Sequence, residues 1–215
     1  MSADQFSLPG MDEDQPNCPL DHVTTTRGSA NGYSLFFAIF PEQQDTSQLV
    51  AAAAKLQSQH GLKGRLQAAE RLHISLYSVA SFENELPQRV VDAAIRAAES
   101  VACSCIPIVW NRAAHYPHGD GFMLLADEAT QQAVAYLQKA LGLALQRTNV
   151  KGARSTGHAH MTLLYDSGAV PLESPLVAPI TWTATRFALV ISHKGLSHYQ
   201  WIGEWPLQSA SASAT

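Results

Sequence analysis

One succession of segments occurs twice in the chain at almost the same length. Each copy begins with an apolar run, continues with a helical pattern, then has a loop with glycine and basic residues, and ends in a short run that carries histidine. The segments are YSLFFAIF (33–40), about 46–60, GLKGR and 71–82 in the first copy, and GFMLLAD (121–127), about 128–147, NVKGAR and 157–166 in the second. This repetition predicts one strand–helix–strand unit used twice, at about 33–80 and 121–166.

The two histidine runs share a four-residue pattern, HISL at 73–76 and HMTL at 160–163. Successive side chains of a strand point to opposite faces, so one face of the first run carries His73, Ser75 and Tyr77. By the same alternation, one face of the second run carries the residues His158, His160, Thr162 and Leu164. Each strand therefore presents an imidazole and a hydroxyl, held in place by apolar neighbours.

Such a pair of strands suits phosphate chemistry. A hydroxyl donates to a non-bridging phosphate oxygen, while an imidazole reaches an oxygen that attacks or leaves. The unperturbed pKa of histidine is about 6.5, so one copy can be neutral and the other protonated near neutral pH. Two facing copies would supply a base and an acid without a metal ion.

The rest of the chain adds further strands and one more helix. A helical pattern covers 87–101, a strand is expected at 103–111, and a strand at 181–193 is expected to pair with 199–207 through the KGLSH turn. The segment NRAAHYPHGDG (111–121) is interpreted as a loop between two strands. Strands mixed with helices in each half predict an α+β fold with two sheets, and the strand positions of the four tryptophans favour a place in the core.

Composition narrows the class of protein. The chain has 215 residues and a formal net charge of −4, which argues against a broad electrostatic grip on duplex DNA. We expect a disordered leader at 1–31, a single bilobal domain at 32–207 and a disordered tail at 208–215, with no membrane span. Three cysteines form no disulfide framework, which favours a reducing, cytoplasmic setting.

The HISL and HMTL motifs, the opening SLFFAIFP and the closing LVISHKGLSHYQWIGEWPL resemble the 2H phosphoesterase superfamily, over about 33–207. This group contains the bacterial RNA 2′,3′-cyclic phosphodiesterases, also called 2′-5′ RNA ligases. The resemblance implies two pseudo-symmetric lobes, each a mostly antiparallel sheet with helices on its outer face, and an active-site cleft between them.

The resemblance also implies roles for individual residues. His73 and His160 would be the catalytic pair, with His73 as acid and His160 as base, and Ser75 and Thr162 would bind the phosphate. The implied reaction opens a 2′,3′-cyclic phosphate, at an RNA 3′ end or on a small nucleotide, to a 2′-phosphate. No cofactor is implied, and a monomer is expected because the duplication supplies both halves of the site.

The chain departs from the family near both motifs. Shortly after the first motif it has SVAS (78–81), where many bacterial members have an apolar FLG. Many bacterial members have arginine five residues after the second histidine, where this chain has Tyr165. The loops before the motifs offer replacement charge, and other residues are placed to touch a base or tune a histidine. The candidate substrate contacts are Tyr77, Lys151, Arg154, His158, Tyr165 and Tyr199, and Lys63 and Arg65 are further loop charges.

Two alternatives stay open from the sequence. The same residues could run reversible 2′-5′ ligation, or the fold could bind nucleotides or RNA ends without turnover. Retention of both histidines and both hydroxyls favours the enzyme, because a pure binder needs no acid–base pair. A zinc set from the residues His115, His118, His158 and His160 is conceivable, but no cysteine or acidic ligand stands in register with it, so we expect no metal.

Overall fold

The computed structural model describes residues 32–83, 85–116, 120–166, 173–193, 195–196 and 199–208. The predicted leader and the tail from residue 209 onward lie outside the described residues. Gln208, which the sequence analysis places in the tail, is part of the fold: it forms a parallel bridge with Ser104, and its backbone N–H donates to the Cys103 carbonyl at 2.8 Å.

Nine strands and three α-helices make up the described part of the chain. The strands are β1 (Tyr33–Ile39), β2 (Ile74–Phe82), β3 (Ile106–His115), β4 (Gly121–Ala126), β5 (Arg154–Ser155), β6 (His160–Tyr165), β7 (Glu173–Ala184), β8 (Arg186–His193) and β9 (Tyr199–Pro206). The helices are α1 (Gln43–Gln59), α2 (Gln88–Glu99) and α3 (Glu128–Arg147), and a 3-10 turn, η1 (Ala69–Arg71), precedes β2.

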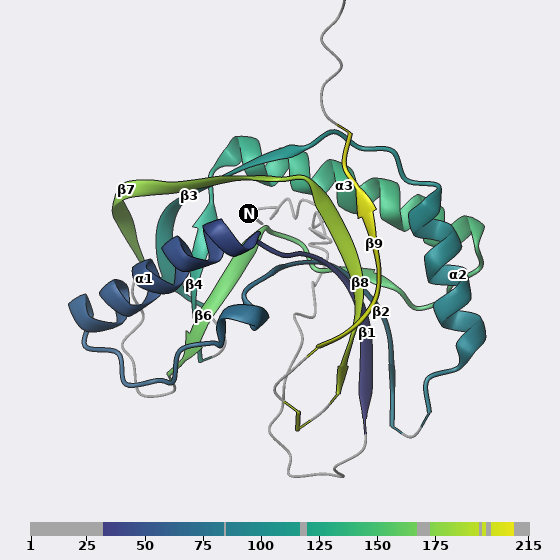
Figure 1. Cartoon of the computed structure of the whole chain (residues 1–215), viewed down its shortest axis with the longest axis horizontal. Helices are drawn as coiled ribbons and strands as arrows, with labels where there is room; N and C mark the ends of the chain where they lie inside the picture. Colours follow the sequence, from purple (N-terminus) through teal and green to yellow (C-terminus); the bar gives the residue numbers. More distant parts are fainter. Residues whose placement is uncertain are drawn as a thin grey trace, which may run out of the picture.

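The strands form two antiparallel sheets with equivalent orders. One has the order β5-β2-β1-β8-β9 and the other β6-β4-β3-β7. Strand β2 therefore corresponds to β6, β1 to β4, β8 to β3, and β9 to β7. The units β1-α1-β2 and β4-α3-β6 are the two predicted repeats, so the expected α+β fold with two pseudo-symmetric lobes is confirmed (Figure 1).

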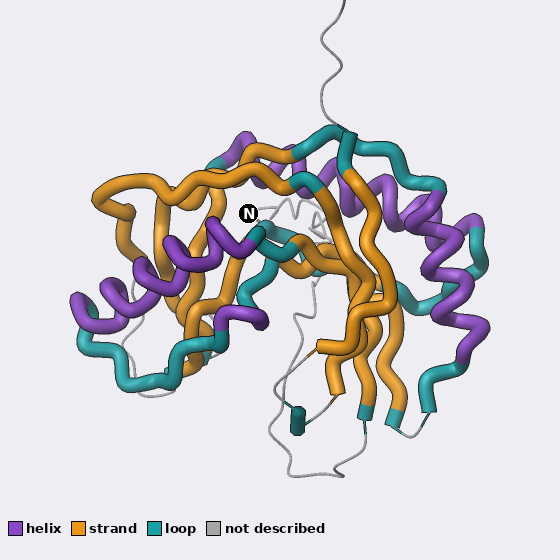
Figure 2. Tube along the Cα trace, viewed as in Figure 1, coloured by secondary structure: helices purple, strands orange, loops and turns teal. Residues whose placement is uncertain are grey.

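The helices lie outside the two sheets (Figure 2). Helix α1 joins two strands of the five-stranded sheet but contacts β7 of the other sheet, and α3 joins two strands of the four-stranded sheet but contacts β2 as well as β3. Each connecting helix thus ties its own sheet to the other one. The buried residues of both sheets and all three helices form one connected hydrophobic cluster, with Phe37, Trp110 and Phe187 among its largest members.

Helix α3 is fixed at its start by side-chain hydrogen bonds. The Asp127 side chain caps the helix by accepting from the Thr130 N–H at 2.8 Å. The Thr130 hydroxyl donates to the Pro107 carbonyl and accepts from the Val109 N–H, so the first turn is joined to β3. The helix bounds match the sequence prediction of 128–147.

Two sequence predictions about strand bounds are wrong. The expected strand at 181–193 is two strands in different sheets, because the chain leaves β7 at Ala184 and enters β8 at Arg186. The sequence alternates up to Ala184 and is continuously apolar from Phe187 to Ile191, and the prediction joined these two patterns into one strand. The expected loop at 111–121 does join two strands, but its bounds are wrong, since β3 runs to His115 and β4 starts at Gly121.

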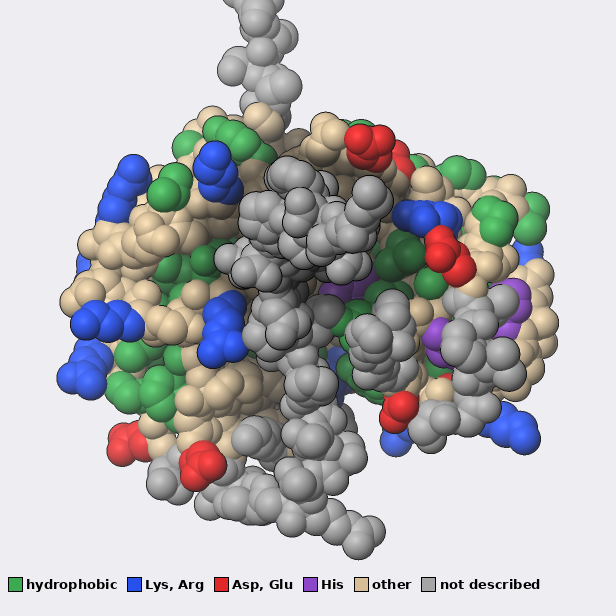
Figure 3. All heavy atoms as spheres, turned by 180° about the vertical axis from the view of Figure 1, so that it is seen from behind, with side chains coloured by type: hydrophobic (Ala, Val, Ile, Leu, Met, Phe, Trp, Pro, Cys, Tyr) green, Lys and Arg blue, Asp and Glu red, His purple; other side chains and the backbone are tan. Residues whose placement is uncertain are grey.

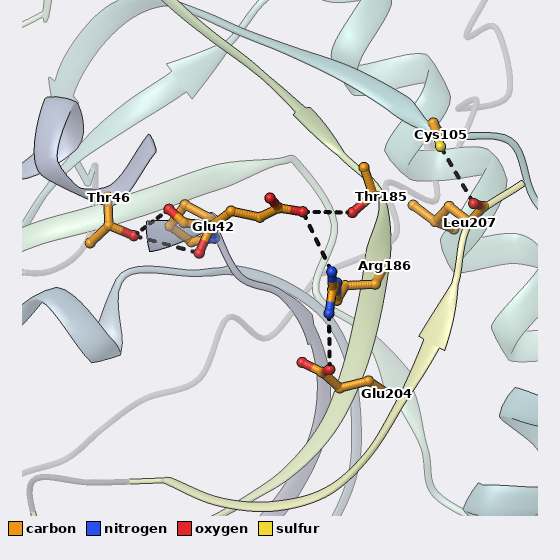
Figure 4. Close-up of polar contacts among 8 residues, drawn as sticks. Glu42, Thr46, Cys105, Thr185, Arg186, Glu204 and Leu207 are labelled. Atoms are coloured by element: carbon orange, nitrogen blue, oxygen red, sulfur yellow. Dashed lines mark hydrogen bonds and ion pairs between the residues drawn. The ribbon is translucent and has the colours of Figure 1, made fainter. Parts of the chain in front are cut away.

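The crossing between the sheets is held by a small polar network (Figure 4). Thr185, between β7 and β8, donates from its hydroxyl to Glu42 at 2.9 Å, just ahead of α1. Glu42 also lies 3.6 Å from Arg186, which pairs with Glu204 of β9 at 3.4 Å. These contacts fix the end of β1, the start of α1 and the crossing strand relative to one another.

Candidate functional site

The two motifs occupy equivalent places in the two sheets. His73 stands directly before β2 and Ser75 within it, while His160 is the first residue of β6 and Thr162 lies two positions on. All four side chains are half-buried. The leucine that ends each motif, Leu76 or Leu163, is completely buried.

Each motif leucine sits at a β-bulge. The β1–β2 register passes from Ser75 to Tyr77 and skips Leu76, and the β4–β6 register passes from Thr162 to Leu164 and skips Leu163. An extra residue shifts every later side chain to the other face of the strand. The histidine and the hydroxyl of each motif therefore share one face of the strand. Beyond the bulge, the alternation of side chains between the two faces is reversed.

The bulges correct the prediction that Tyr77 shares a face with Ser75, and likewise that Leu164 shares one with Thr162. Tyr77 is the register partner of Phe37, on the opposite face from Ser75, and its ring lies against Gly142 of α3. An added Cβ at Gly142 would stand 2.9 Å from the Tyr77 hydroxyl, so this packing depends on glycine. Tyr77 fills the interface between sheet and helix and is not a base-stacking residue.

The same shift brings Tyr165 to the face of Thr162. Tyr165 is 56% exposed and is the register partner of Gly121. Burial raises the pKa of Tyr199, and the charge of Tyr165 adds to that rise, so the two phenols are close although they come from different sheets. Tyr165 and Tyr199 therefore lie near each other, and their role as substrate contacts stays a prediction.

The segment before each motif contacts the motif strand of the other half of the chain. The loop before the first motif lies along β6: Leu66 bridges Leu164, and the Gln67 N–H donates to the Leu163 carbonyl at 2.7 Å. The strand before the second motif, β5, pairs with β2, and the Thr156 hydroxyl donates to the Ser75 carbonyl at 2.6 Å. The two motifs are thus held next to each other by backbone contacts from opposite lobes.

One glycine makes the first of these contacts possible. A Cβ at Gly64 would stand 2.0 Å from the Tyr165 carbonyl oxygen, closer than any side chain allows. The backbone N–H groups of Lys63 and Gly64 also donate to the Asp166 carboxylate, at 2.6 and 3.2 Å. The glycine in GLKGR therefore serves the docking of this loop on the end of β6.

Both imidazoles are anchored in the same way. The Nδ1 of His73 lies 2.7 Å from the Arg71 carbonyl, and the Nδ1 of His160 lies 2.9 Å from the His158 carbonyl, two residues earlier in each case. A carbonyl oxygen only accepts, so Nδ1 carries the hydrogen and Nε2 of the neutral ring keeps a lone pair. In His73 this Nε2 accepts from the Ser75 hydroxyl at 3.0 Å.

Burial keeps both histidines neutral in the free protein. Burial lowers the pKa of His73 from 6.5 to about 4, and the charges of His160 and Arg71 add to the lowering, while the hydrogen bond to the Arg71 carbonyl opposes it. The pKa of His160 is also lowered by burial. The charge of His160 is felt at His73, so the two rings lie near each other.

An aromatic wall surrounds His73. Its ring centroid lies 5.4 Å from that of Phe36, 5.6 Å from Phe40 and 5.5 Å from Tyr199, the last at an interplanar angle of 89°. Phe40 also contacts Trp201 at 4.6 Å, and Trp201 is 47% exposed, so the prediction that Trp201 fills the core is wrong. The spacing of Phe36 and Phe40 by an even number of residues was the sequence signal for this wall.

Arg71 stands at the same place, and sequence reasoning missed it. Its guanidinium Cζ lies 5.0 Å from the Tyr199 ring centroid, and Nη2 donates to the Tyr199 hydroxyl at 3.4 Å. The available signal was its position two residues before His73. In an extended chain that spacing would put both side chains on the same face. The chain is instead in the turn η1.

The predicted loop charges lie at the edges of the site. Arg154 is exposed and is the register partner of Ser78, on the face that carries Phe36 and Ser75. Lys151 is exposed in the loop before β5, and His158 is exposed as well, with its carbonyl holding His160. Arg154 and His158 are thus next to the motifs, while the position of Lys151 in the loop does not by itself bring its charge to the site.

A hollow of about 880 Å³ opens beside the aromatic wall. Phe40, Leu72 and Trp201 line it together with residues from the start of α1. Its cation, Arg186, is already paired with Glu42 and Glu204. The hollow thus offers apolar and aromatic surface with acidic neighbours, which suits a nucleoside better than a phosphate.

The histidines of the conceivable zinc set do not come together among the described residues. In that part of the chain, no group of three His, Cys, Asp or Glu side chains is placed to hold a metal ion. His115 lies in β3 against Phe122, with a ring separation of 5.0 Å, and His118 lies outside the described residues. None of the described helices is long and apolar enough to cross a membrane.

Comparison with solved structures gives the same architecture. E. coli LigT complexed with 3′-AMP is 19% identical, with a TM-score of 0.63 over 83% of this chain and 99% of LigT. A protein described as a phosphoesterase (18% identity, TM-score 0.61) and a protein of Thermus thermophilus (17%, 0.62) match over 83% and 82% of this chain and 100% and 98% of their own.

LigT has also been crystallised with ATP, NADP+ and phosphate. No family model and no curated protein sequence matches the chain. The structural likeness therefore carries the assignment of the fold, with the paired motifs at equivalent places in both lobes. The chain has the two-lobed fold of the 2H phosphoesterases, to which E. coli LigT belongs.

Proposed function

We propose that the protein is a metal-independent phosphodiesterase that opens a ribose 2′,3′-cyclic phosphate to a 2′-phosphate. The observation that carries this proposal is the pair of equivalently anchored imidazoles. His73 and His160 each donate Nδ1–H to a backbone carbonyl, so Nε2 of each neutral ring keeps the lone pair that can take a proton. The charge of His160 lowers the pKa of His73, which supports a short distance between the two rings.

The reaction needs one proton to be taken and one to be given. Water attacks the phosphorus while His160 Nε2 takes its proton, and the bond from phosphorus to the ribose 3′ oxygen breaks. His73, protonated on Nε2, gives its proton to that departing oxygen. The products are a 2′-phosphate and a free 3′-hydroxyl. After the reaction His160 carries a proton and His73 is neutral, and proton exchange with solvent restores the starting state.

The motif hydroxyls have a natural part in this scheme. In the free protein the Ser75 hydroxyl donates to His73 Nε2. Once His73 is protonated, Nε2 donates instead, and the Ser75 hydrogen becomes available for a non-bridging phosphate oxygen. Thr162, at the equivalent place on β6, would contact the phosphate from the other side, and both hydroxyls stabilise charge that develops in the transition state.

The surroundings favour a single nucleotide or the last nucleotides of an RNA strand. The aromatic wall and the hollow lined by Phe40 and Trp201 can hold a base. Lys and Arg side chains are scattered over the face shown in Figure 3, with acidic ones between them, and the net charge is −4. That distribution argues against a long duplex, and the nucleotide complexes of LigT are in line with it.

The setting proposed for this activity is a monomer in a reducing, cytoplasmic compartment. Cys103 and Cys105 are free thiols, and Cys103 is buried in the core, where burial raises its thiol pKa. One chain supplies both histidines. Gel filtration with light scattering would test the monomer directly.

The test is hydrolysis of a short RNA that ends in a 2′,3′-cyclic phosphate, in the presence of EDTA. Wild type should form a 2′-phosphate, identified by NMR, and His73→Ala or His160→Ala should lower turnover by roughly 10² or more. His60→Ala is the matched control, because His60 contacts Phe122 on the face of β4 opposite to Thr162. Absence of turnover by wild type, or full activity in either catalytic variant, would contradict the proposal.

A further inference from the structure

Arg71 is a fixed cation next to the proposed acid. It is the last residue of η1, and its carbonyl holds His73 Nδ1. Its guanidinium lies over the Tyr199 ring and contacts the Tyr199 hydroxyl. Tyr199 is itself fixed by edge contacts with Phe36 and His73. A cation over an aromatic face is attracted to it, so the guanidinium keeps one position with little freedom.

The charge of Arg71 has no anionic partner within the described part of the chain. The ion pairs found there join Arg112 to Glu173, and Arg186 to Glu42 and Glu204. The Nε of Arg71 is buried and makes no hydrogen bond to the described residues. A half-buried guanidinium with an unused N–H is costly, and an anion that binds there removes the cost.

The field of Arg71 reaches the reacting groups. Its charge lowers the pKa of His73, and it opposes the rise in the pKa of Tyr199. The equivalent residue of the second motif is His158, whose side chain is exposed. The two halves of the site therefore differ in charge, and the permanent cation stands beside His73.

We propose that Arg71 binds the phosphate of the substrate, through its unused Nε–H and a terminal N–H, and that Tyr199 is the positioning residue that aims it. This inference rests on the proposed function for the identity of the phosphate ester. An oxygen held by Arg71 would lie next to His73, so the negative charge of the bound phosphate also favours the protonated form of His73. The substrate class is an anionic phosphodiester with a non-bridging oxygen directed at the aromatic wall.

The first experiment measures binding of inorganic phosphate by calorimetry, without turnover. Arg71→Gln should weaken the affinity roughly 10- to 100-fold, because a charge-assisted hydrogen bond is lost. Arg71→Lys should recover part of the loss. Arg112→Gln is the matched control: it removes the same charge from an exposed ion pair and should change affinity less than about twofold.

The second experiment follows His73 by NMR in the same variants. Removal of the Arg71 charge should raise the pKa of His73, while the Arg71 carbonyl still accepts from His73 Nδ1. A purely structural disturbance would not produce this rise together with weaker phosphate binding. Tyr199→Leu, which keeps Arg71 but removes its support, should weaken phosphate binding as well, and Tyr199→Phe should do so less.

The outcomes separate this proposal from the proposed function. Equal phosphate affinity in wild type, Arg71→Gln and Arg71→Lys, or no phosphate binding by wild type, would overturn the role of Arg71. If phosphate binding depends on Arg71 but wild type opens no cyclic phosphate, the role of Arg71 stands and the proposed reaction fails. If Arg71→Gln does not fold, the comparison of Arg71→Lys with Tyr199→Leu decides the matter in the same assay.

Discussion

The pKa of His73 should depend strongly on whether a phosphate is bound. In the free protein burial lowers this pKa to about 4. At pH 7 roughly one His73 in a thousand is then protonated, which is too little for a general acid. A phosphate charge about 4 Å away, at an effective dielectric constant near 20, contributes about 4 kcal/mol, or about 3 pKa units. Binding should therefore raise the pKa of His73 to about 7.

The assay is a titration of the histidine ring protons by NMR, with and without saturating inorganic phosphate. His73→Asn and His160→Asn identify the two signals. We expect the His73 signal to titrate near pH 4 in the free protein and near pH 7 in the phosphate complex. A free-protein pKa near 6.5, or an identical pKa in the complex, would refute the reasoning, because either result means that His73 is not buried beside the bound anion.

Four further results are expected. The bell-shaped pH profile of kcat should lie at higher pH than that of kcat/KM, since bound substrate raises the histidine pKa values. From pH 6.5 down to pH 4 the unfolded chain binds a proton that folded His73 does not, so in urea unfolding wild type should lose about 3 kcal/mol more stability than His73→Asn over this range. Gly64→Ala should cost roughly 1–3 kcal/mol in the same assay. Thr156→Val and its control Thr148→Val should each cost about 1 kcal/mol, but only Thr156→Val should slow turnover.

Sequence reasoning recovered the features that repeat and lost those that depend on one inserted residue. The strand–helix–strand units, the motif histidines and the bounds of α3 follow from periodicity, which is a property of short stretches of sequence. The bulges at Leu76 and Leu163 do not, because an alternating run reads the same whether or not its partner strand skips a residue. The misplacement of Tyr77 is the direct result.

The candidate site shows the same limit. His73, Ser75, His160 and Thr162 belong to two four-residue motifs and can be found by inspection. Arg71 is within two residues of His73, yet its position over Tyr199 depends on a contact between residues 128 positions apart. No local pattern encodes such a contact, and the exposed place of Trp201 is set by β9 in the same way.

The duplication raises a question that the geometry answers. Two copies of one unit would give two identical histidines, whereas acid–base catalysis needs two that differ in protonation. The backbone anchor is indeed the same in both, a carbonyl two residues before the ring. The surroundings differ: His73 has the aromatic wall and the cation Arg71, and His160 has the exposed His158.

The backbone carbonyls orient the two rings, and the neighbouring side chains set their pKa values. Orientation and protonation are therefore controlled by different parts of the structure. Exchange of Arg71 and His158 between the motifs should therefore leave both rings in place but raise the pKa of His73 and lower that of His160. NMR titration of Arg71→His combined with His158→Arg would show this. An unchanged pKa of His73 would mean that burial in the aromatic wall, and not the cation, makes His73 different from His160.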